Sequence, residues 1–529
     1  MTSTKSTEDA HYALRILDRL DGGERPVVHW GETVISGSEL RAAVLRVVGA
    51  LTALDVRPGA AVALLTEVNS PWLLAARYAV HLMGGTVVAV SGANHGTTTH
   101  QLDTRSRVRM ARECGARVLV HDESQREEAA RMRALLPDGT GLCELGAPLS
   151  GPVTADGHPV EGPPPGFSAR VPAHALVLYT SGSTGRPKGV VKPFAAWNRV
   201  VLAESSTLDH DKVFLAMSAV THTGGLLVDT AVAAGGSVVL RTGFDPGALL
   251  ADIEEYRVTD TLMGVPQFYE LVNHPGVGTA DLSSLRRLLY VGCPASPERV
   301  REAVKLFPGV LHHSYGTTET GQISMLTPAD HDIPERLSSV GRPRPGVEVV
   351  VQDPRTGREL PRGETGEVVV RSPLVMTGYA ADPELTAQVL RDGWVHTGDF
   401  GRLDEDGRLR LSGRMNDVVK VHDTKVHPSE VEKVLVGHRG VIDAYVYPHR
   451  SSDLIEELHA AVVLRSDDPP AFEALRAHVA EAMTPTHAPV RFVRWRRFPV
   501  NGSGKVDRRL VRERGLATAP GDTAVLAAD

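Results

Sequence analysis

The chain has little cysteine: its 529 residues include only Cys114, Cys143 and Cys293. Three scattered cysteines cannot build a disulfide framework, and their spacing does not match a zinc site. Disulfide-rich folds belong to oxidising compartments. The shortage of cysteine therefore argues against a secreted, disulfide-stapled protein and predicts a reducing, cytoplasmic location.

Positive charge and long apolar runs are also scarce. The chain has 57 lysines and arginines against 64 aspartates and glutamates, a net charge of −7. Bulk binding of nucleic acid needs an excess of cations, so we expect no nucleic-acid partner. Residues 61–90 form the most apolar region, but charged and polar residues interrupt it, so no membrane span is predicted. Residues 1–9 have no apolar core and do not resemble a signal peptide.

Short β-rich runs alternate with helical patterns in the first half of the chain. This alternation predicts an α/β fold, in which helices cover mainly parallel β-sheets. Strands are expected at Val62–Leu65, Thr86–Val90, Arg117–Val120 and Ser237–Leu240, a helix at Trp72–Met83 and a surface loop at Gly151–Pro165.

After about Ser338 the pattern changes to short strands separated by turns, which predicts a β-barrel-like subdomain and then a small α+β domain. The expected strands are Val347–Gln352, Gly366–Arg371, Arg408–Ser412, Asp443–Tyr447 and Leu458–Leu464, and the expected helices are Ser429–Val436 and Ala471–Met483. We divide the chain into a large N-terminal domain (1–413), a hinge (414–417), a small C-terminal domain (418–516) and a disordered tail (517–529).

The densest cluster of chemistry-bearing residues is Tyr179–Gly189, with three glycines, four hydroxyl residues other than tyrosine, an arginine and a lysine. It follows the apolar run Ala175–Leu178, so a buried strand leads into a loop of small donors and cations. Such a loop offers N–H groups, hydroxyls and positive charge to one anion, which predicts a phosphate site. It is not a Walker loop, because Pro187 precedes Lys188 and no Ser or Thr follows the lysine.

This loop resembles the signature loop of the AMP-forming adenylating superfamily, which contains acyl- and aryl-CoA synthetases, adenylation domains of peptide synthetases, and luciferases. Three further segments match the family's motifs in the same order. They are Tyr315–Glu319, Gly393–Asp399 followed by Arg414, and Asn501–Arg508. The resemblance covers nearly the whole chain and implies that the small domain is mobile and rotates about the hinge.

The resemblance implies roles for the residues in these motifs. The catalytic groups would be Lys505 at the α-phosphate, Lys188 in the phosphate loop and Glu319 as the Mg²⁺ ligand. Tyr315 would lie against adenine, and Asp399 would bind the ribose. The implied nucleotide contacts are Thr180, Ser181, Gly182, Ser183, Thr184, Gly185, Lys188, Gly292, Cys293, Tyr315, Gly316, Thr317, Thr318, Asp399 and Arg414.

The implied first half-reaction is attack of a carboxylate oxygen on the α-phosphorus of ATP, which yields an acyl-adenylate and pyrophosphate. Two anions must meet, so the site must supply positive charge. A carboxylate is already ionised at neutral pH and needs no general base. The implied cofactors are ATP and Mg²⁺, and the usual acceptor in the second half-reaction is CoA.

The resemblance also implies a substrate pocket. Its members would be His222, Thr223, Gly225, Gly264, Val291 and Gly316. The segment just after position 215 lacks the Phe-Asp pair that grips the α-amino group in amino-acid adenylation domains. We therefore expect a small aromatic or short acyl acid as the substrate.

Two positions depart from the family's pattern. Asn416 stands at the hinge, where Asp or Lys is usual, and Asn tolerates the same backbone angles. Asp423 stands in the acceptor channel, where the family commonly has glycine, and adds bulk and negative charge beside a route for anionic CoA. Two interpretations stay open: tolerated drift, or impaired thioester formation.

Several functions and partners are therefore compatible with the sequence. The acceptor is CoA, a carrier protein or an amine, and the amine route includes activation of nitrite for diazotisation of an aromatic amine. A catalytically silent nucleotide-binding homologue is the alternative from another class, although the family's catalytic residues are all present. A homodimer is left open.

Overall fold

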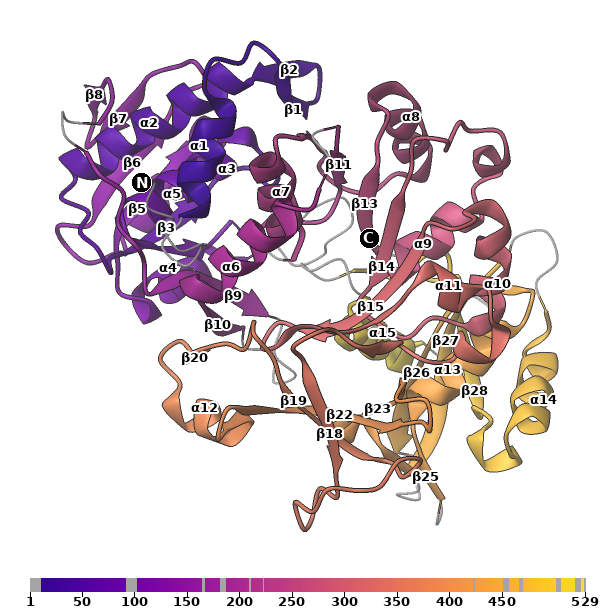
Figure 1. Ribbon diagram of the computed structural model, residues 1–529. Helices are drawn as coiled ribbons and strands as arrows, with labels where there is room; N and C mark the ends of the chain where they lie inside the picture. Colours follow the sequence, from indigo (N-terminus) through magenta and orange to yellow (C-terminus); the bar gives the residue numbers. More distant parts are fainter. Residues whose placement is uncertain are drawn as a thin grey trace, which may run out of the picture.

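The protein is described by a computed structural model that covers residues 11–91, 102–163, 167–180, 187–208, 211–221, 223–421, 424–450, 456–465, 470–500, 506–518 and 525–527. The side chains of Thr223, Asn416, Lys420 and Lys425 are outside this description. Figure 1 shows two α/β lobes, an orange β-rich region beneath them and a smaller C-terminal unit in orange to yellow.

The first sheet is parallel at its centre and antiparallel at both edges. Among the described residues its order is β20 (Gly378–Tyr379), β10 (Lys188–Pro193), β9 (His174–Thr180), β4 (Thr86–Ala89), β3 (Ala61–Leu65), β5 (Ala116–Asp122), β6 (Gly141–Leu145), β7 (Val153–Ala155) and β8 (His158–Val160). Every residue of β3 is buried, as expected for a strand in a parallel sheet with both faces covered.

The second sheet has the same design, with a parallel centre and antiparallel edges. Its described strands run in the order β17 (Arg342–Pro343), β16 (Gly321–Leu326), β15 (Leu311–Thr317), β14 (Arg287–Val291), β13 (Asp260–Gly264), β11 (Val213–Ala216), β12 (Ser237–Leu240), β1 (Pro26–Trp30) and β2 (Thr33–Ser36). The alternation in the first half of the sequence thus correctly predicted helix-covered, mainly parallel sheets.

A third, antiparallel sheet follows. It consists of β18 (Glu348–Gln352), β19 (Gly366–Arg371), β22 (Trp394–Leu403) and β21 (Leu390–Arg391), and β23 (Leu409–Arg414) also pairs with β22. The small C-terminal unit contains the hairpin β24 (Val419–Val421) and β25 (Thr424–Val426) and the sheet β26 (Val441–Arg450), β27 (Glu456–Leu464) and β28 (Arg491–Trp495). The strands and helices expected from the sequence all occur within three residues of their predicted bounds.

Helices cover the sheets and carry recognisable start signals. For example, α2 begins with a capping box, in which Ser36 N–H donates to Glu39 Oε2 (2.8 Å) and Glu39 N–H donates to Ser36 Oγ (3.2 Å). The described α-helices are α1 Tyr12–Leu20, α2 Gly37–Ala53, α3 Pro71–Leu82, α4 Thr104–Glu113, α5 Arg126–Arg133, α6 Phe194–Ser205, α7 Thr223–Ala234, α8 Pro246–Tyr256, α9 Val265–Val272, α10 Pro297–Leu306, α11 Pro328–His331, α12 Pro383–Val389, α13 Pro428–Gly437, α14 Phe472–Ala482 and α15 Arg508–Ala517. The described 3₁₀ helices are Glu123–Gln125, Pro275–Gly278, Pro334–Arg336, Met415–Asp417 and Pro485–His487.

A buried ion pair joins the helices of the two large sheets. Arg77 of α3 pairs with Asp229 of α7, and the two side chains are 3% and 0% exposed. Trp197 of α6 also donates to Asp229, from Nε1 to Oδ2 (3.0 Å), while Arg77 Nη1 donates to the Val220 carbonyl (2.7 Å). Because all the charged groups have partners, this polar cluster can lie inside the apolar core.

The prediction of a surface loop at Gly151–Pro165 is wrong for the central part of this segment, where β7 and β8 form an antiparallel hairpin. Asp156 and Gly157 make its two-residue turn, with φ of 47° and 84°. An Asp-Gly pair is a strong signal for such a turn, and the high Gly and Pro content of the segment obscured it. Pro159 fits in β8 because this strand is at the edge of the sheet.

The prediction of a disordered tail at 517–529 is also wrong for the residues that the structure describes, 517–518 and 525–527. The N–H of Leu526 donates to the carbonyl of Arg494 (3.0 Å), and the N–H of Arg496 donates to the carbonyl of Leu526 (2.7 Å). The Leu526 side chain packs on the apolar cluster that contains Trp495. The tail therefore satisfies backbone groups at the edge of the small sheet.

No helix in the described part of the chain is long and apolar enough to cross a membrane. This agrees with the polar residues that interrupt residues 61–90, where α3 is a fully buried helix of the large domain. The division into domains at residues 413 and 417 stays a prediction. Strand β23 ends at Arg414, and the 3₁₀ turn Met415–Asp417 follows it at this boundary.

His81 is a fully buried histidine that is neutral in the folded protein. Its Nε2 donates to the Ala175 carbonyl (2.7 Å), and its Nδ1 accepts from the Tyr12 hydroxyl (2.6 Å). Burial lowers the pKa of His81 to about 3. Because this folded-state pKa lies below the ordinary value of 6.5, the unfolded chain takes up the proton first as the pH falls, and stability is lost from about pH 6.5 towards pH 3.

We expect protonation linked to His81 to cost about 2 kcal/mol of unfolding free energy between pH 7 and pH 5. In the variant His81→Gln, urea unfolding should give a lower unfolding free energy at pH 7. The decrease in unfolding free energy between pH 7 and pH 5 should be smaller than in the wild type. The control His158→Gln changes an exposed histidine and should keep the wild-type pH dependence. A wild-type pH dependence in His81→Gln would contradict the prediction.

Candidate active site

The candidate site lies at the carboxyl ends of the parallel strands of the second sheet. The register places Gly264 at the end of β13 beside Val291 at the end of β14, and Val291 beside Ser314 in β15. Ala216, at the end of β11, is beside Leu262 of β13. In open α/β sheets, ligands bind in the crevice outside the carboxyl ends of the strands. The register therefore brings the predicted pocket segments to a common edge.

Tyr315 and Asp399 meet at this edge, although 84 residues separate them. The Tyr315 hydroxyl donates to Asp399 Oδ2 (2.6 Å), and Arg414 Nε lies 2.7 Å from Asp399 Oδ1. Arg414 is the register partner of Asp399 across β22 and β23. Burial and the Asp399 charge raise the pKa of Tyr315, so its hydroxyl stays a donor. An ionised carboxylate has about four acceptor positions, so Asp399 can still accept from ribose hydroxyls.

The segment Gly316–Thr320 forms the tight turn between β15 and β16. A side chain at Gly316 would place its Cβ 2.3 Å from the Gly321 carbonyl oxygen, so only glycine fits there. The hydroxyls of Thr317 and Thr320 are 3.0 Å apart, and the N–H of Thr320 donates to Thr317 Oγ1 (3.2 Å). This network orders the turn that carries Thr318 and Glu319.

Glu319 connects the turn to the first sheet. The Tyr379 hydroxyl donates to Glu319 Oε1 (2.7 Å), and Tyr379 pairs with Val190 across β20 and β10. Lys188 Nζ lies over the Tyr379 ring, 5.9 Å from its centroid. Lys188 and Glu319, predicted as catalytic residues from separate motifs, are therefore joined through one tyrosine.

The donor set fits a magnesium ion that is held together with phosphates. Glu319 keeps one carboxylate oxygen, Oε2, outside the Tyr379 hydrogen bond. Among the described residues no group of three His, Cys, Asp or Glu side chains is arranged to hold a metal. Mg²⁺ is typically bound by one or two carboxylates plus substrate phosphates and does not need such a cage.

The phosphate loop connects two antiparallel strands. Thr180, the last residue of β9, pairs with Lys188, the first residue of β10. The chain after the loop is therefore a strand and not a helix, whereas a Walker loop is followed by a helix. Its predicted contacts Ser181, Gly182, Ser183, Thr184 and Gly185 lie outside the described residues.

Gly292 and Cys293 leave the same edge, directly after β14. Gly292 has a φ of 103°, which favours glycine. The Cys293 carbonyl accepts from Nε2 of His313 (3.2 Å), whose ring stacks on Tyr290 with 4.5 Å between centroids. Burial lowers the pKa of His313 to about 4, so its ring is neutral. His313 thus holds the backbone of the predicted adenine and substrate segment.

The remaining predicted residues are less fully described. Gly225 lies at the start of α7, where an added Cβ would be 2.0 Å from the Val220 carbonyl oxygen, so glycine permits this close packing. His222, Asp423 and Lys505 lie outside the described residues, as do the side chains of Thr223 and Asn416. Their roles stay predictions.

One of the two segments that flank Lys505 contacts the large domain, and the other contacts the hinge. Arg497 lies 2.9 Å from Glu270 of α9. Arg508 pairs with Glu432 (3.1 Å) and with Asp417 at the hinge (3.6 Å). The charge of Glu432 is the largest cause that raises the pKa of Arg508, and Cys293 adds to this effect. The contacts of the two flanks of residues 501–505 therefore run to α9 on one side and to the hinge and α13 on the other.

Three site residues were not predicted from the sequence: Tyr379, His313 and Lys192. Tyr379 lies outside the four matched motifs. Lys192 directly follows the apolar pair Val190–Val191 in β10, and a charged residue at such a place is a usable signal for a buried polar contact. Nothing in the local sequence around His313 indicates its contact with Cys293.

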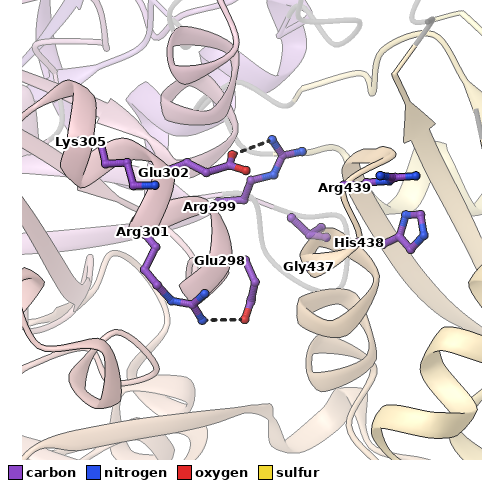
Figure 2. Close-up of a pocket in the computed structure, with 9 residues that line it drawn as sticks. Glu298, Arg299, Arg301, Glu302, Lys305, Gly437, His438 and Arg439 are labelled. Atoms are coloured by element: carbon purple, nitrogen blue, oxygen red, sulfur yellow. Dashed lines mark hydrogen bonds and ion pairs between the residues drawn. The ribbon is translucent and has the colours of Figure 1, made fainter. Parts of the chain in front are cut away.

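A crevice of about 400 Å³ between α10 and the end of α13 is separate from this site (Figure 2). Glu298 pairs with Arg301 (3.1 Å) and Arg299 with Glu302 (3.7 Å) along its large-domain wall. None of the predicted site residues line it. The charged side chains of this crevice pair with one another, so the strand ends are the better candidate for the active site.

Comparisons with known proteins agree with this site. A family model described as "AMP-binding enzyme" matches residues 20–380, and one described as "AMP-binding enzyme C-terminal domain" matches residues 430–505. The medium/long-chain-fatty-acid–CoA ligase FadD8 of Mycobacterium tuberculosis is 30% identical over 531 residues, which cover 96% of this chain and 90% of the relative. The feruloyl-CoA synthase of an Amycolatopsis species is 33% identical over 499 residues, 92% of this chain and 95% of the relative.

Solved structures show the same architecture. The amide bond synthetase McbA from Marinactinospora thermotolerans is 34% identical and superposes with a TM-score of 0.83, covering 96% of this chain and 100% of the other. ATP-bound MatB from Rhodopseudomonas palustris is 26% identical, with a TM-score of 0.80 over 95% and 98% of the two chains. The two family models and the likeness to full-length relatives lead to one conclusion: this chain belongs to the AMP-binding enzyme family and is an AMP-forming ligase similar to acyl-CoA synthetases.

Proposed function

We propose that the protein activates a small aromatic or short acyl carboxylic acid with ATP, releases pyrophosphate, and transfers the acyl group from the adenylate to CoA. The observation that carries this proposal is the convergence of Lys188, Glu319, Tyr315 and Asp399 at one sheet edge. These four residues come from three of the family motifs and from segments of three sheets, and each suits a different part of ATP.

The nucleotide would be held from both ends. Asp399, which is buried and bonded to Tyr315 and Arg414, would accept from the ribose, and the Tyr315 ring would lie against adenine. Thr318 and the loop from Thr180 to Lys188 would contact the phosphates. Gly292 and Cys293, positioned by His313, would lie near adenine and the acid.

The reaction needs positive charge rather than a base. An ionised acid attacks the α-phosphorus, and the developing negative charge is met by Lys188 and by Lys505 from the small domain. Removing one such preorganised donor typically costs roughly 3–4 kcal/mol of transition-state stabilisation. A Mg²⁺ held by Glu319 supplies further charge neutralisation on the phosphates when it is bound.

An aromatic acid is favoured by the names of several relatives. Feruloyl-CoA synthase, 4-coumarate–CoA ligase 2 and indoleacetate–CoA ligase are 32–33% identical to this chain. FadD8 is named for fatty acids, so an acyl substrate stays within the proposal. A reducing cytoplasmic location is part of the same proposal, because the three cysteines are all free thiols.

A second candidate is transfer to an amine. It is favoured by the likeness to amide bond synthetase McbA, whose 34% identity extends over 96% of this chain, and by Asp423 in the predicted acceptor channel. In either case the second half-reaction would require the small domain to rotate about residues 414–417.

A panel of aromatic and short acyl acids should reveal ATP–pyrophosphate exchange in the wild-type protein. The variant Lys505→Ala should reduce exchange with the best acid by 100-fold or more, on the order expected for one lost transition-state contact, and leave ATP binding within about threefold. Lys305→Ala changes an exposed lysine on α10 and should exchange normally. Unchanged exchange in Lys505→Ala would refute the role of Lys505.

Asp399→Ala should raise the KM for ATP about 10-fold or more, because hydrogen bonds to a charged group contribute about 1.5–3 kcal/mol each. The kcat of exchange should fall less than KM rises, since the ribose contact is made in both ground and transition states. Asp404→Asn alters another ion-paired aspartate of the same sheet and should leave KM unchanged. A wild-type KM in Asp399→Ala would remove Asp399 from the ribose site.

Replacing Asp423 by glycine should favour thioester formation. Asp423→Gly removes a carboxylate from the predicted route of anionic CoA, so acyl-CoA should form several-fold faster than in the wild type, with ATP–pyrophosphate exchange unchanged. Parallel reactions with CoA and with an aromatic amine, followed by product chromatography, identify the acceptor. Equal or slower acyl-CoA formation in Asp423→Gly would show that Asp423 does not obstruct CoA.

A further inference from the structure

Lys192 is a buried cation without an ion pair. Its side chain lies in β10, four residues after Lys188, and the residue is only 5% exposed. Within the described chain no carboxylate lies within ion-pair distance of its Nζ. Instead Nζ donates to the carbonyls of Thr318 (3.0 Å), Glu319 (3.5 Å) and Leu374. Three carbonyl oxygens therefore converge on one ammonium group.

These carbonyls belong to segments that the ammonium group holds together. Thr318 and Glu319 lie in the turn between β15 and β16 of the second sheet, and Leu374 lies between β19 and β20. The same contact region includes hydrogen bonds from Met376 N–H to the Glu319 carbonyl (2.7 Å) and from Ser372 Oγ to the Thr320 carbonyl (2.8 Å). Lys192 and Tyr379 both tie this region to the first sheet, Lys192 through the backbone carbonyls and Tyr379 through the Glu319 carboxylate.

An apolar residue would fill this position at lower cost. Burying an ammonium group without a paired carboxylate is unfavourable, since water solvates the charge better than three carbonyls do. Lys192 is therefore an unfavourable buried cation that directly contacts the turn of Thr318 and Glu319, and this indicates a functional role.

We propose that Lys192 is a positioning residue that fixes the backbone of the Thr318–Glu319 turn, so that the Glu319 carboxylate faces the metal-bound phosphates of ATP. The inference rests on the proposed role of Glu319 in holding Mg²⁺. Two side chains then determine the orientation of Glu319: Tyr379 binds its carboxylate, and Lys192 binds its backbone.

The test measures equilibrium ATP binding by calorimetry, once with Mg²⁺ and once with EDTA. Lys192→Met should weaken ATP binding with Mg²⁺ by about 10-fold or more, the usual effect of losing a residue that orients a metal ligand, and change binding in EDTA less than about twofold. Glu319→Gln should show the same Mg²⁺-specific loss. The double variant should bind no more weakly than Glu319→Gln alone, because Lys192 acts through Glu319.

Lys212→Met is the matched control. Lys212 is also a buried lysine, and its partner Asp260 keeps a second ion pair with Arg287 (2.8 Å). Thermal unfolding should show destabilisation in this control without a change in Mg²⁺-dependent binding. If Lys192→Met does not fold, Lys192→Gln retains two donors and should still show a Mg²⁺-specific loss of about threefold.

An equal loss in the Mg²⁺ and EDTA experiments, a further loss in the double variant, or the same Mg²⁺-specific loss in Lys212→Met would overturn the proposal. Failure of the proposed function is distinguishable from this result. If no acid supports ATP–pyrophosphate exchange in the wild type, the acid ligase proposal fails, while Mg²⁺-dependent ATP binding still reports on Lys192.

Discussion

The parallel register of β13, β14 and β15 is the constraint on which the active site depends. It places Gly264, Val291 and Ser314 side by side at one edge of the sheet. The segments after β13 and β14 leave the ladder there, whereas β15 continues to Thr317 in its antiparallel pairing with β16. A shift in this register would separate Tyr315 from the Gly292–Cys293 segment, and no single side chain could compensate.

Glu319 is the point at which the three large sheets meet. Its turn belongs to the second sheet, Tyr379 and Lys192 bring the first sheet to its carboxylate and carbonyl, and the Leu374 segment follows the third. A hydrogen-bonded cation and a tyrosine are directional, whereas apolar packing is not. This explains how a turn between two antiparallel strands can hold the proposed metal ligand in one orientation.

Local patterns predicted the elements of the fold well, because buried parallel strands and amphipathic helices have strong periodic signals. They failed where local and long-range information differed. The β7–β8 hairpin was hidden by glycine and proline, although Asp156-Gly157 signalled its turn. The ordered part of the tail could not be predicted, because Leu526 is held by hydrogen bonds to Arg494 and Arg496 on a strand about thirty residues earlier.

The sequence by itself determined the family, the order of the motifs and the residue types that suit ATP, since loops rich in small donors and cations have few other uses. It also predicted Lys188, Tyr315, Glu319 and Asp399 as members of one site. Only the tertiary structure decided how they meet: through Tyr379 between Lys188 and Glu319, through the Tyr315–Asp399 hydrogen bond, and through Lys192 beneath the turn. These contacts join residues from 60 to more than 180 positions apart, and their geometry follows from strand register and burial, which no local pattern contains.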